Sequence, residues 1–97
     1  MKNQVTKQEL IEKLNKFGIG DTMNDLMPRL PKAFIKNGTH YSLDIRFLFG
    51  MFEVNYEDDT YVLPNVDEHE EMVDAVADAV INIETMIKNG EITNLIY

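Results

Sequence analysis

The sequence predicts an α+β fold: an antiparallel β-meander of three to five strands with one face covered by an N-terminal helix and a long C-terminal helix. Two observations predict it. Apolar residues recur at helical spacing near both ends of the chain. Through the middle they alternate with polar residues, and turn residues separate the alternating segments. The length of 97 residues fits a single α+β domain, 1–97, with one small core.

The N-terminal helix is predicted to begin after Thr6, because Thr6 and Glu9 have the spacing of a capping box. Apolar residues follow Leu10 at helical spacing, and Gly18 is predicted to end the helix in the left-handed conformation. Residues 22–27 are predicted to add one or two further helical turns before the prolines that follow.

The first β-hairpin is predicted at Asn37-Gly38. This pair favours a type I′ turn, which needs positive φ at both central residues. The turn would place Phe34 opposite Tyr41 and would keep both side chains on the apolar face of the sheet.

A second two-residue turn is predicted at Gly50-Met51, where the phase of the apolar alternation changes. This turn would place Phe49 opposite Phe52. A bulge at Gly50 within one long strand is the alternative. A third turn is predicted at residues 58–59.

The long C-terminal helix is predicted to span residues 67–89, with Asp67 as its N-cap. Its apolar residues form one stripe from Met72 to Ile87. Residues 91–97 are predicted to add an edge strand because they are rich in β-prone side chains. The side of the helix opposite the apolar stripe is predicted to carry four carboxylates: Asp67, Glu71, Asp74 and Asp78.

Charge is divided unevenly along the chain. Residues 1–50 contain eight Lys or Arg and five Asp or Glu, whereas residues 51–97 contain one Lys and twelve Asp or Glu. Such a field repels nucleic acid and anionic membranes, and it attracts a basic protein surface. The chain has no cysteine, no long apolar run and no apolar N-terminal segment. We therefore expect no disulfide, membrane span or secretory signal, and a cytoplasmic location.

The acidic stretch 66–78 is the leading candidate site, with six carboxylates and no basic residue. The helix dipole favours carboxylates in the first turn, but Asp74 and Asp78 lie beyond its reach and repel each other. Two interpretations stay open: a solvated helix face, or a binding surface for a basic partner. In the second interpretation the binding residues are Glu71, Asp74, Asp78, Asp67, Glu57, Asp58 and Asp59.

The predicted function is that of a small, non-enzymatic acidic protein that occupies a basic protein surface. One such surface is the nucleic-acid site of an enzyme, which is lined by Lys and Arg. At the level of architecture the chain resembles the small acidic inhibitors that phages encode, such as anti-restriction, anti-CRISPR and uracil-DNA glycosylase inhibitors. The alternatives are an immunity-type protein that neutralises a basic toxin, and an assembly subunit or homodimer that uses the open sheet face.

No catalytic, cofactor or metal site is predicted. Glu70, Glu71 and Asp74 resemble half of the EExxE metal site of all-α nucleotide pyrophosphohydrolases, but the second carboxylate pair is missing. The two histidines, His40 and His69, have no predicted acid–base partner. Five basic residues are expected to be solvated or to pair with the acidic half of the chain: Lys13, Lys16, Arg29, Lys32 and Lys36.

Overall fold

The computed structural model describes residues 6–58 and 68–97. Within these residues, four strands form one antiparallel sheet in the order β3-β2-β1-β4, which confirms both the α+β class and the edge strand at the C-terminal end. The elements are α1 (Lys7–Lys16), α2 (Met23–Leu26), η1 (Met27–Arg29), β1 (Ala33–Lys36), β2 (Thr39–Leu48), β3 (Met51–Glu57), α3 (Met72–Lys88) and β4 (Thr93–Ile96).

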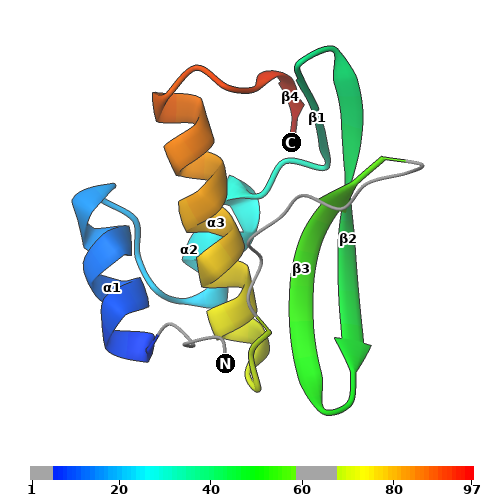
Figure 1. The fold of residues 1–97 in the computed structure, drawn as a ribbon. Helices are drawn as coiled ribbons and strands as arrows, with labels where there is room; N and C mark the ends of the chain where they lie inside the picture. Colours follow the sequence, from blue (N-terminus) through cyan, green and yellow to red (C-terminus); the bar gives the residue numbers. More distant parts are fainter. Residues whose placement is uncertain (1–5, 59–67) are drawn as a thin grey trace.

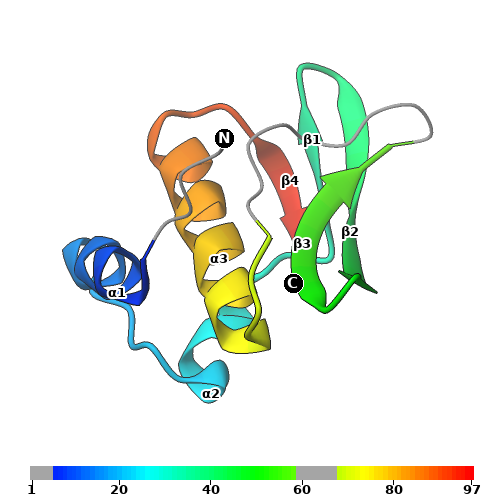
Figure 2. The ribbon, with the colours of Figure 1, turned by 60° about the horizontal axis from the view of Figure 1, so that its bottom comes forward.

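Helix α3 is the central layer of the molecule. It lies against the apolar face of the sheet, and α1 packs on the opposite side of α3 (Figures 1 and 2). Ile83 packs with Phe34 and Tyr56 of the sheet, whereas Ala77 and Ile81 face α1. The buried surface of α3 is therefore wider than the single apolar stripe that the sequence predicts.

The predicted helix starts at the N-terminal side are confirmed. The side chain of Thr6 caps α1 by accepting a hydrogen bond from the backbone N–H of Glu9 at 3.2 Å. Gly18 follows the helix with a φ of 71°. The short helix α2 begins after Thr22, which forms a capping box with Asp25.

The predicted hairpin at Asn37-Gly38 is also confirmed. Both residues have positive φ, 52° and 78°, as a type I′ turn requires. Phe34 pairs with Tyr41 across the two strands, and their rings stack. The turn predicted at residues 58–59 extends outside the residues that the structure describes.

The second turn lies at Phe49-Gly50, one residue earlier than predicted, and both of these residues have positive φ. Gly50 thus belongs to a turn and not to a bulge. Phe52 therefore pairs with Phe47 instead of with Phe49. The two registers differ by two residues, so both leave every side chain on the same face of the sheet. The apolar alternation could not distinguish between them.

Helix α3 begins at Met72, five residues later than predicted, and its N-cap is Glu71 instead of Asp67. The segment before it is held by β3. The backbone N–H of Phe52 donates to the carbonyl of His69 at 2.6 Å, and the N–H of His69 donates to the carbonyl of Phe52 at 2.9 Å. This bridge requires extended backbone at His69, which prevents the helix from starting earlier.

We expect the substitution Tyr56→Phe to lower the free energy of unfolding by about 1 kcal/mol at neutral pH. The hydroxyl of Tyr56 is buried and donates a hydrogen bond to the carbonyl of Pro31 at 2.7 Å, so the substitution leaves a buried carbonyl without its donor. Urea unfolding followed by circular dichroism measures the difference.

The same variant is expected to change the alkaline stability. Burial raises the pKa of Tyr56 above its ordinary value. Folding therefore favours the neutral phenol, and the stability linked to it is present below pH ~10 and is lost as the pH rises further. Tyr56→Phe should show a smaller loss of stability on alkalinisation than the parent. Tyr41→Phe is the matched control, because within the described residues Tyr41 donates no hydrogen bond. An equal effect of both substitutions would contradict this prediction.

Candidate functional site

Asp78, predicted as a partner-binding residue, is buried. Only 8% of its surface is exposed, and its Oδ2 lies 3.0 Å from Nε2 of His69, which is 6% exposed. The predicted position of Asp78 on the exposed side of the helix is therefore wrong, and so is the prediction that His69 has no acid–base partner. The physical reason is the second buried side of α3, which the single-stripe prediction did not include.

Glu71 and Asp74 lie close together at the start of α3, and both are paired within the chain. Nζ of Lys7 in α1 lies 3.2 Å from the Glu71 carboxylate and 3.1 Å from the Asp74 carboxylate. The hydrogen bond to Asp74, and to a smaller extent the one to Glu71, raises the pKa of Lys7 above its ordinary value. The side chain of Asp74 is only 20% exposed, against 62% for Glu71, so Glu71 is the one that faces solvent.

Glu57, another predicted binding residue, belongs to a charged cluster on the sheet. Arg46 donates hydrogen bonds to both Asp44 and Glu57. A hydrogen bond between the two carboxyl groups raises the pKa of Glu57 and lowers the pKa of Asp44. Contact with Asp44 and Glu57 raises the pKa of Arg46 as well. The charge of Glu57 is thus partly balanced by its own neighbours.

The predicted binding carboxylates that the structure describes do not form one surface. Glu57 and Asp58 lie at the far end of β3 from Phe52, about 16 Å away for five residues of extended strand. Phe52 is the residue that bridges to the segment before α3. Asp59 and Asp67 fall outside the described residues.

The tip of the β2–β3 hairpin exposes a group of apolar side chains. The sequence predicts an outward position for Leu48, whereas the apolar alternation predicts that Phe47 and Phe49 face the core, which is wrong. Phe49 is 100% exposed, Phe47 59% and Leu48 54%. The tip extends beyond α3 (Figure 1). The rings of Phe47 and Phe52 are in contact, with their centroids 4.5 Å apart, so this part of the tip is packed within the hairpin.

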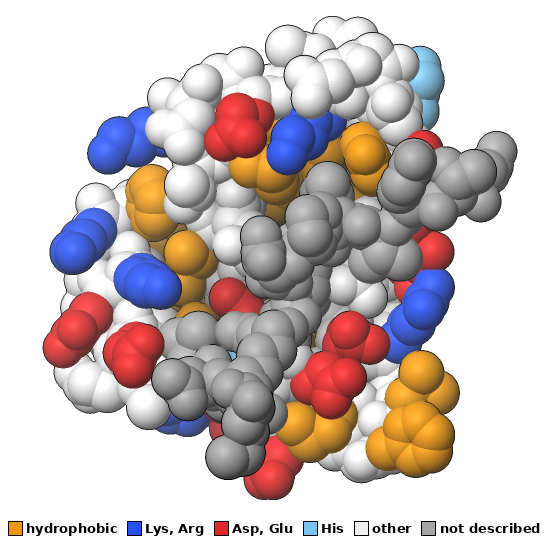
Figure 3. Space-filling view, in the orientation of Figure 1, with side chains coloured by type: hydrophobic (Ala, Val, Ile, Leu, Met, Phe, Trp, Pro, Cys, Tyr) orange, Lys and Arg blue, Asp and Glu red, His pale blue; other side chains and the backbone are white. Residues whose placement is uncertain are grey.

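Carboxylates border this apolar tip. The bridge between Phe52 and His69 holds residues 68–71 beside the hairpin. Figure 3 shows apolar side chains at the lower edge of the molecule next to carboxylates. We call the combined area the hairpin surface; it consists of Ile45, Phe47, Leu48, Phe49, Met51, Glu68, Glu70 and Glu71.

Phe49 has an unfavourable backbone conformation in the isolated chain. Its φ of 53° lies in the left-handed region, which side chains other than Asn, Asp and Gly rarely adopt. The same type of turn elsewhere in the chain uses the preferred Asn37-Gly38 pair. The Phe49 ring is fully exposed, so no packing offsets this conformation. The Phe-Gly pair at a turn is the sequence signal that could have indicated this site.

Comparison of the chain with protein-family models, with curated proteins and with solved structures gave no match. Within residues 6–58 and 68–97, no three side chains of the metal-binding types come together as a metal site. No helix in this part of the chain has the length and apolar character needed to cross a bilayer. Geometry, exposure and charge are therefore the features on which a functional proposal rests.

Proposed function

We propose that this chain is a small, non-enzymatic interaction protein that binds a partner protein through the hairpin surface. The observation that carries the proposal is Phe49, which combines a left-handed backbone conformation with complete exposure of an aromatic ring. Strained residues cluster at binding sites, and buried aromatic anchors contribute much of the free energy of protein–protein binding. The partner would provide an apolar pocket that takes up the Phe49 ring.

Because this chain is acidic, we expect basic side chains around the partner's pocket. The net charge is −8, and residues 68–71 place exposed carboxylates beside the hairpin tip. Complementary charge speeds association and orients the two proteins, while the apolar contact governs how slowly they separate. A partner whose pocket is bordered by Lys and Arg fits both properties.

An inhibitor of a nucleic-acid-acting enzyme is the specific form of this proposal. The phosphate-binding sites of such enzymes are lined by Lys and Arg. A small acidic protein with a projecting apolar hairpin would cover such a site and exclude the nucleic acid. We place this encounter in the cytoplasm, which the absence of cysteine from the sequence fits.

The proposal is tested by affinity capture from a bacterial lysate with the parent chain, Phe49→Asn and Glu70→Gln/Glu71→Gln as three parallel baits. We expect one basic protein to be retained by the parent at low salt and lost with Phe49→Asn. Equal retention by the parent and Phe49→Asn would overturn the proposal. Recovery of only a second copy of this chain would assign an assembly role instead.

We expect Glu70→Gln/Glu71→Gln to slow association with the captured partner by about tenfold at low salt, with little change in dissociation. Both side chains are exposed, so their charges act mainly over distance during the encounter. Surface plasmon resonance at two salt concentrations measures both rates. The matched control is Glu9→Gln/Glu12→Gln, which removes the same charge from the exposed side of α1. An equal slowing by the control would show that only net charge matters.

The acidic double variant is expected to remain folded. The Glu71 contact with Lys7 joins two side chains that are more than half exposed, and exposed ion pairs contribute little because water and salt screen them. Thermal unfolding of the variant should therefore closely match that of the parent. A change in binding can then be attributed to charge and not to loss of structure.

A further inference from the structure

The basic side chains of this acidic protein fall into a paired group and an unpaired group. Within the described residues, Lys13, Lys16 and Lys88 contact no carboxylate, although the sequence contains 17 Asp and Glu residues. Lys32 is unpaired as well, but it lies elsewhere on the surface. The paired group contacts carboxylates at 3.9 Å or less and consists of Lys7, Arg29, Lys36 and Arg46.

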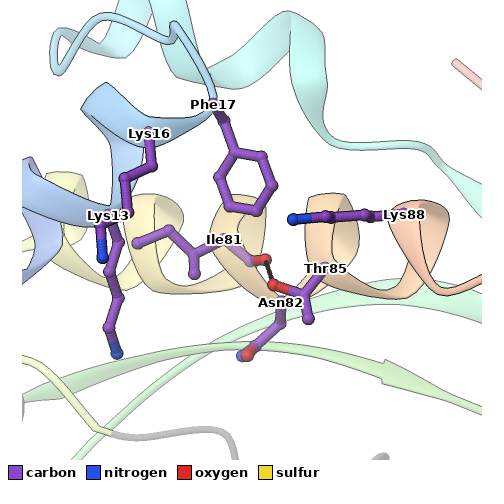
Figure 4. Close-up of a pocket in the computed structure, with 7 residues that line it drawn as sticks. All are labelled: Lys13, Lys16, Phe17, Ile81, Asn82, Thr85 and Lys88. Atoms are coloured by element: carbon purple, nitrogen blue, oxygen red, sulfur yellow. Dashed lines mark hydrogen bonds between the residues drawn. The ribbon is translucent and has the colours of Figure 1, made fainter.

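Three of the four unpaired lysines, Lys13, Lys16 and Lys88, line one depression between α1 and α3, with a volume of about 580 Å³. Figure 4 shows Lys88 extending from α3 toward the ring of Phe17, with Lys13 and Lys16 on the side of α1. No carboxylate is among the described residues that line it. The depression is thus a local positive site on a negatively charged molecule.

The remaining lining residues supply both apolar and polar contacts. Phe17 is half-buried and Ile81 is buried, so they form an apolar wall. Thr85 donates its hydroxyl proton to the carbonyl of Ile81 at 2.7 Å, which leaves the hydroxyl oxygen as an acceptor. The amide of Asn82 offers both donors and an acceptor. Lysine side chains, an aromatic ring and an amide therefore line one depression.

We propose that this depression binds a small phosphate ester that carries a flat aromatic group, as a nucleotide does. Lysine ammonium groups act as point charges for phosphate, and three of them would balance its charge. The aromatic group would lie against Phe17 and Ile81, and Asn82 would form hydrogen bonds with its polar edge. The volume matches the range of small-molecule sites.

The charge of the whole molecule favours a small ligand over a nucleic acid chain. A polyanion that extends beyond the depression would meet the field of a protein whose net charge is −8. A compact anion interacts mainly with the nearby lysines, because salt screens charges more than about 10 Å away. The site lies on the α1–α3 side of the molecule and is independent of the hairpin surface.

The test is a titration with adenosine 5′-monophosphate, followed by nuclear magnetic resonance at the backbone amides of Asn82 and Thr85. We expect saturable shifts with a dissociation constant below about 1 mM. Adenosine and inorganic phosphate, each carrying half of the recognised chemistry, are expected to bind at least about tenfold more weakly. Titration with phenyl phosphate, which has a ring and a phosphate but no base, separates stacking on Phe17 from recognition of the base.

Substitutions assign the binding to the depression. We expect Lys13→Gln/Lys88→Gln to weaken binding of the nucleotide at least about tenfold, and Lys32→Gln to change it less than about twofold. All three positions are exposed, so the variants should keep the fold, which circular dichroism checks. The proposal is overturned if the amide shifts do not saturate. It is also overturned if Lys32→Gln weakens binding as much as the double variant does.

Discussion

Phe49→Asn is expected to stabilise the fold and at the same time to abolish tight partner binding. The free energy of unfolding should rise by about 1 kcal/mol, because Asn adopts the left-handed conformation more readily than Phe does. No packing is lost, since the Phe49 ring is fully exposed in the isolated chain. Loss of an aromatic anchor should weaken binding by about two orders of magnitude.

The chain contains its own reference for this prediction. Asn37-Gly38 and Phe49-Gly50 both form two-residue turns with positive φ at both positions, and they differ in the first residue. The reciprocal substitution Asn37→Phe is expected to destabilise the fold by about 1 kcal/mol and to leave partner binding unchanged. Urea unfolding measures both stabilities, and surface plasmon resonance with the captured partner measures both affinities.

The decisive result is that Phe49→Asn raises the free energy of unfolding while it lowers the affinity for the partner. A binding site often retains a residue that the folded state alone would not favour. If Phe49→Asn lowers both stability and affinity, the residue supports the hairpin itself and is not an anchor for a partner. If stability rises and affinity stays the same, the partner binds elsewhere.

Asp78→Ala is expected to lower the free energy of unfolding by about 3 kcal/mol, because it leaves the buried ring of His69 without its partner. Asp78→Asn should cost less, because its amide keeps the shape of the carboxyl group and still hydrogen-bonds an imidazole nitrogen. Urea unfolding at neutral pH measures the three proteins together. The effect should exceed that of any exposed carboxylate in the acidic stretch.

Asp74→Ala is the matched control, because Asp74 lies one turn earlier in α3 and pairs with the half-exposed side chain of Lys7. We expect it to cost less than about 1 kcal/mol. The single variant His69→Ala and the double variant Asp78→Ala/His69→Ala then complete the cycle that measures the coupling between the two buried residues. Equal losses from Asp74→Ala and Asp78→Ala would mean that the buried pair adds no particular stability.

Local signals in the sequence predicted most of the secondary structure. Helical spacing, the capping residue Thr6 and the Asn37-Gly38 pair act within a few residues of the chain, and the structure has the elements they predict. The alternation of apolar residues also predicted which face of the sheet packs on α3, but it wrongly placed Phe47 and Phe49 in the core, because both lie at the exposed hairpin tip. It could not predict the register at Phe49-Gly50, because two neighbouring registers place the same side chains on that face.

Tertiary contacts decided which carboxylates are exposed on the surface. Asp78 looks like an exposed acidic residue in the sequence, and it is buried only because α3 is covered on two sides and His69 is held next to it by the bridge to Phe52. The sequence pattern predicts that Asp74 is exposed, but Asp74 is paired with Lys7 of α1, a helix that is distant in the sequence. These contacts join residues far apart in the chain, so no local pattern encodes them.

The sequence by itself thus determined the α+β class, the helices and strands, and the excess of negative charge in the second half. Only the tertiary structure decided where α3 begins, which of its carboxylates are buried, and that the hairpin tip and the segment 68–71 form one surface. The physical reason is the separation in sequence over which each interaction acts. Caps, turns and periodicity act between near neighbours, whereas burial and charge pairing depend on which distant segment packs against each side chain.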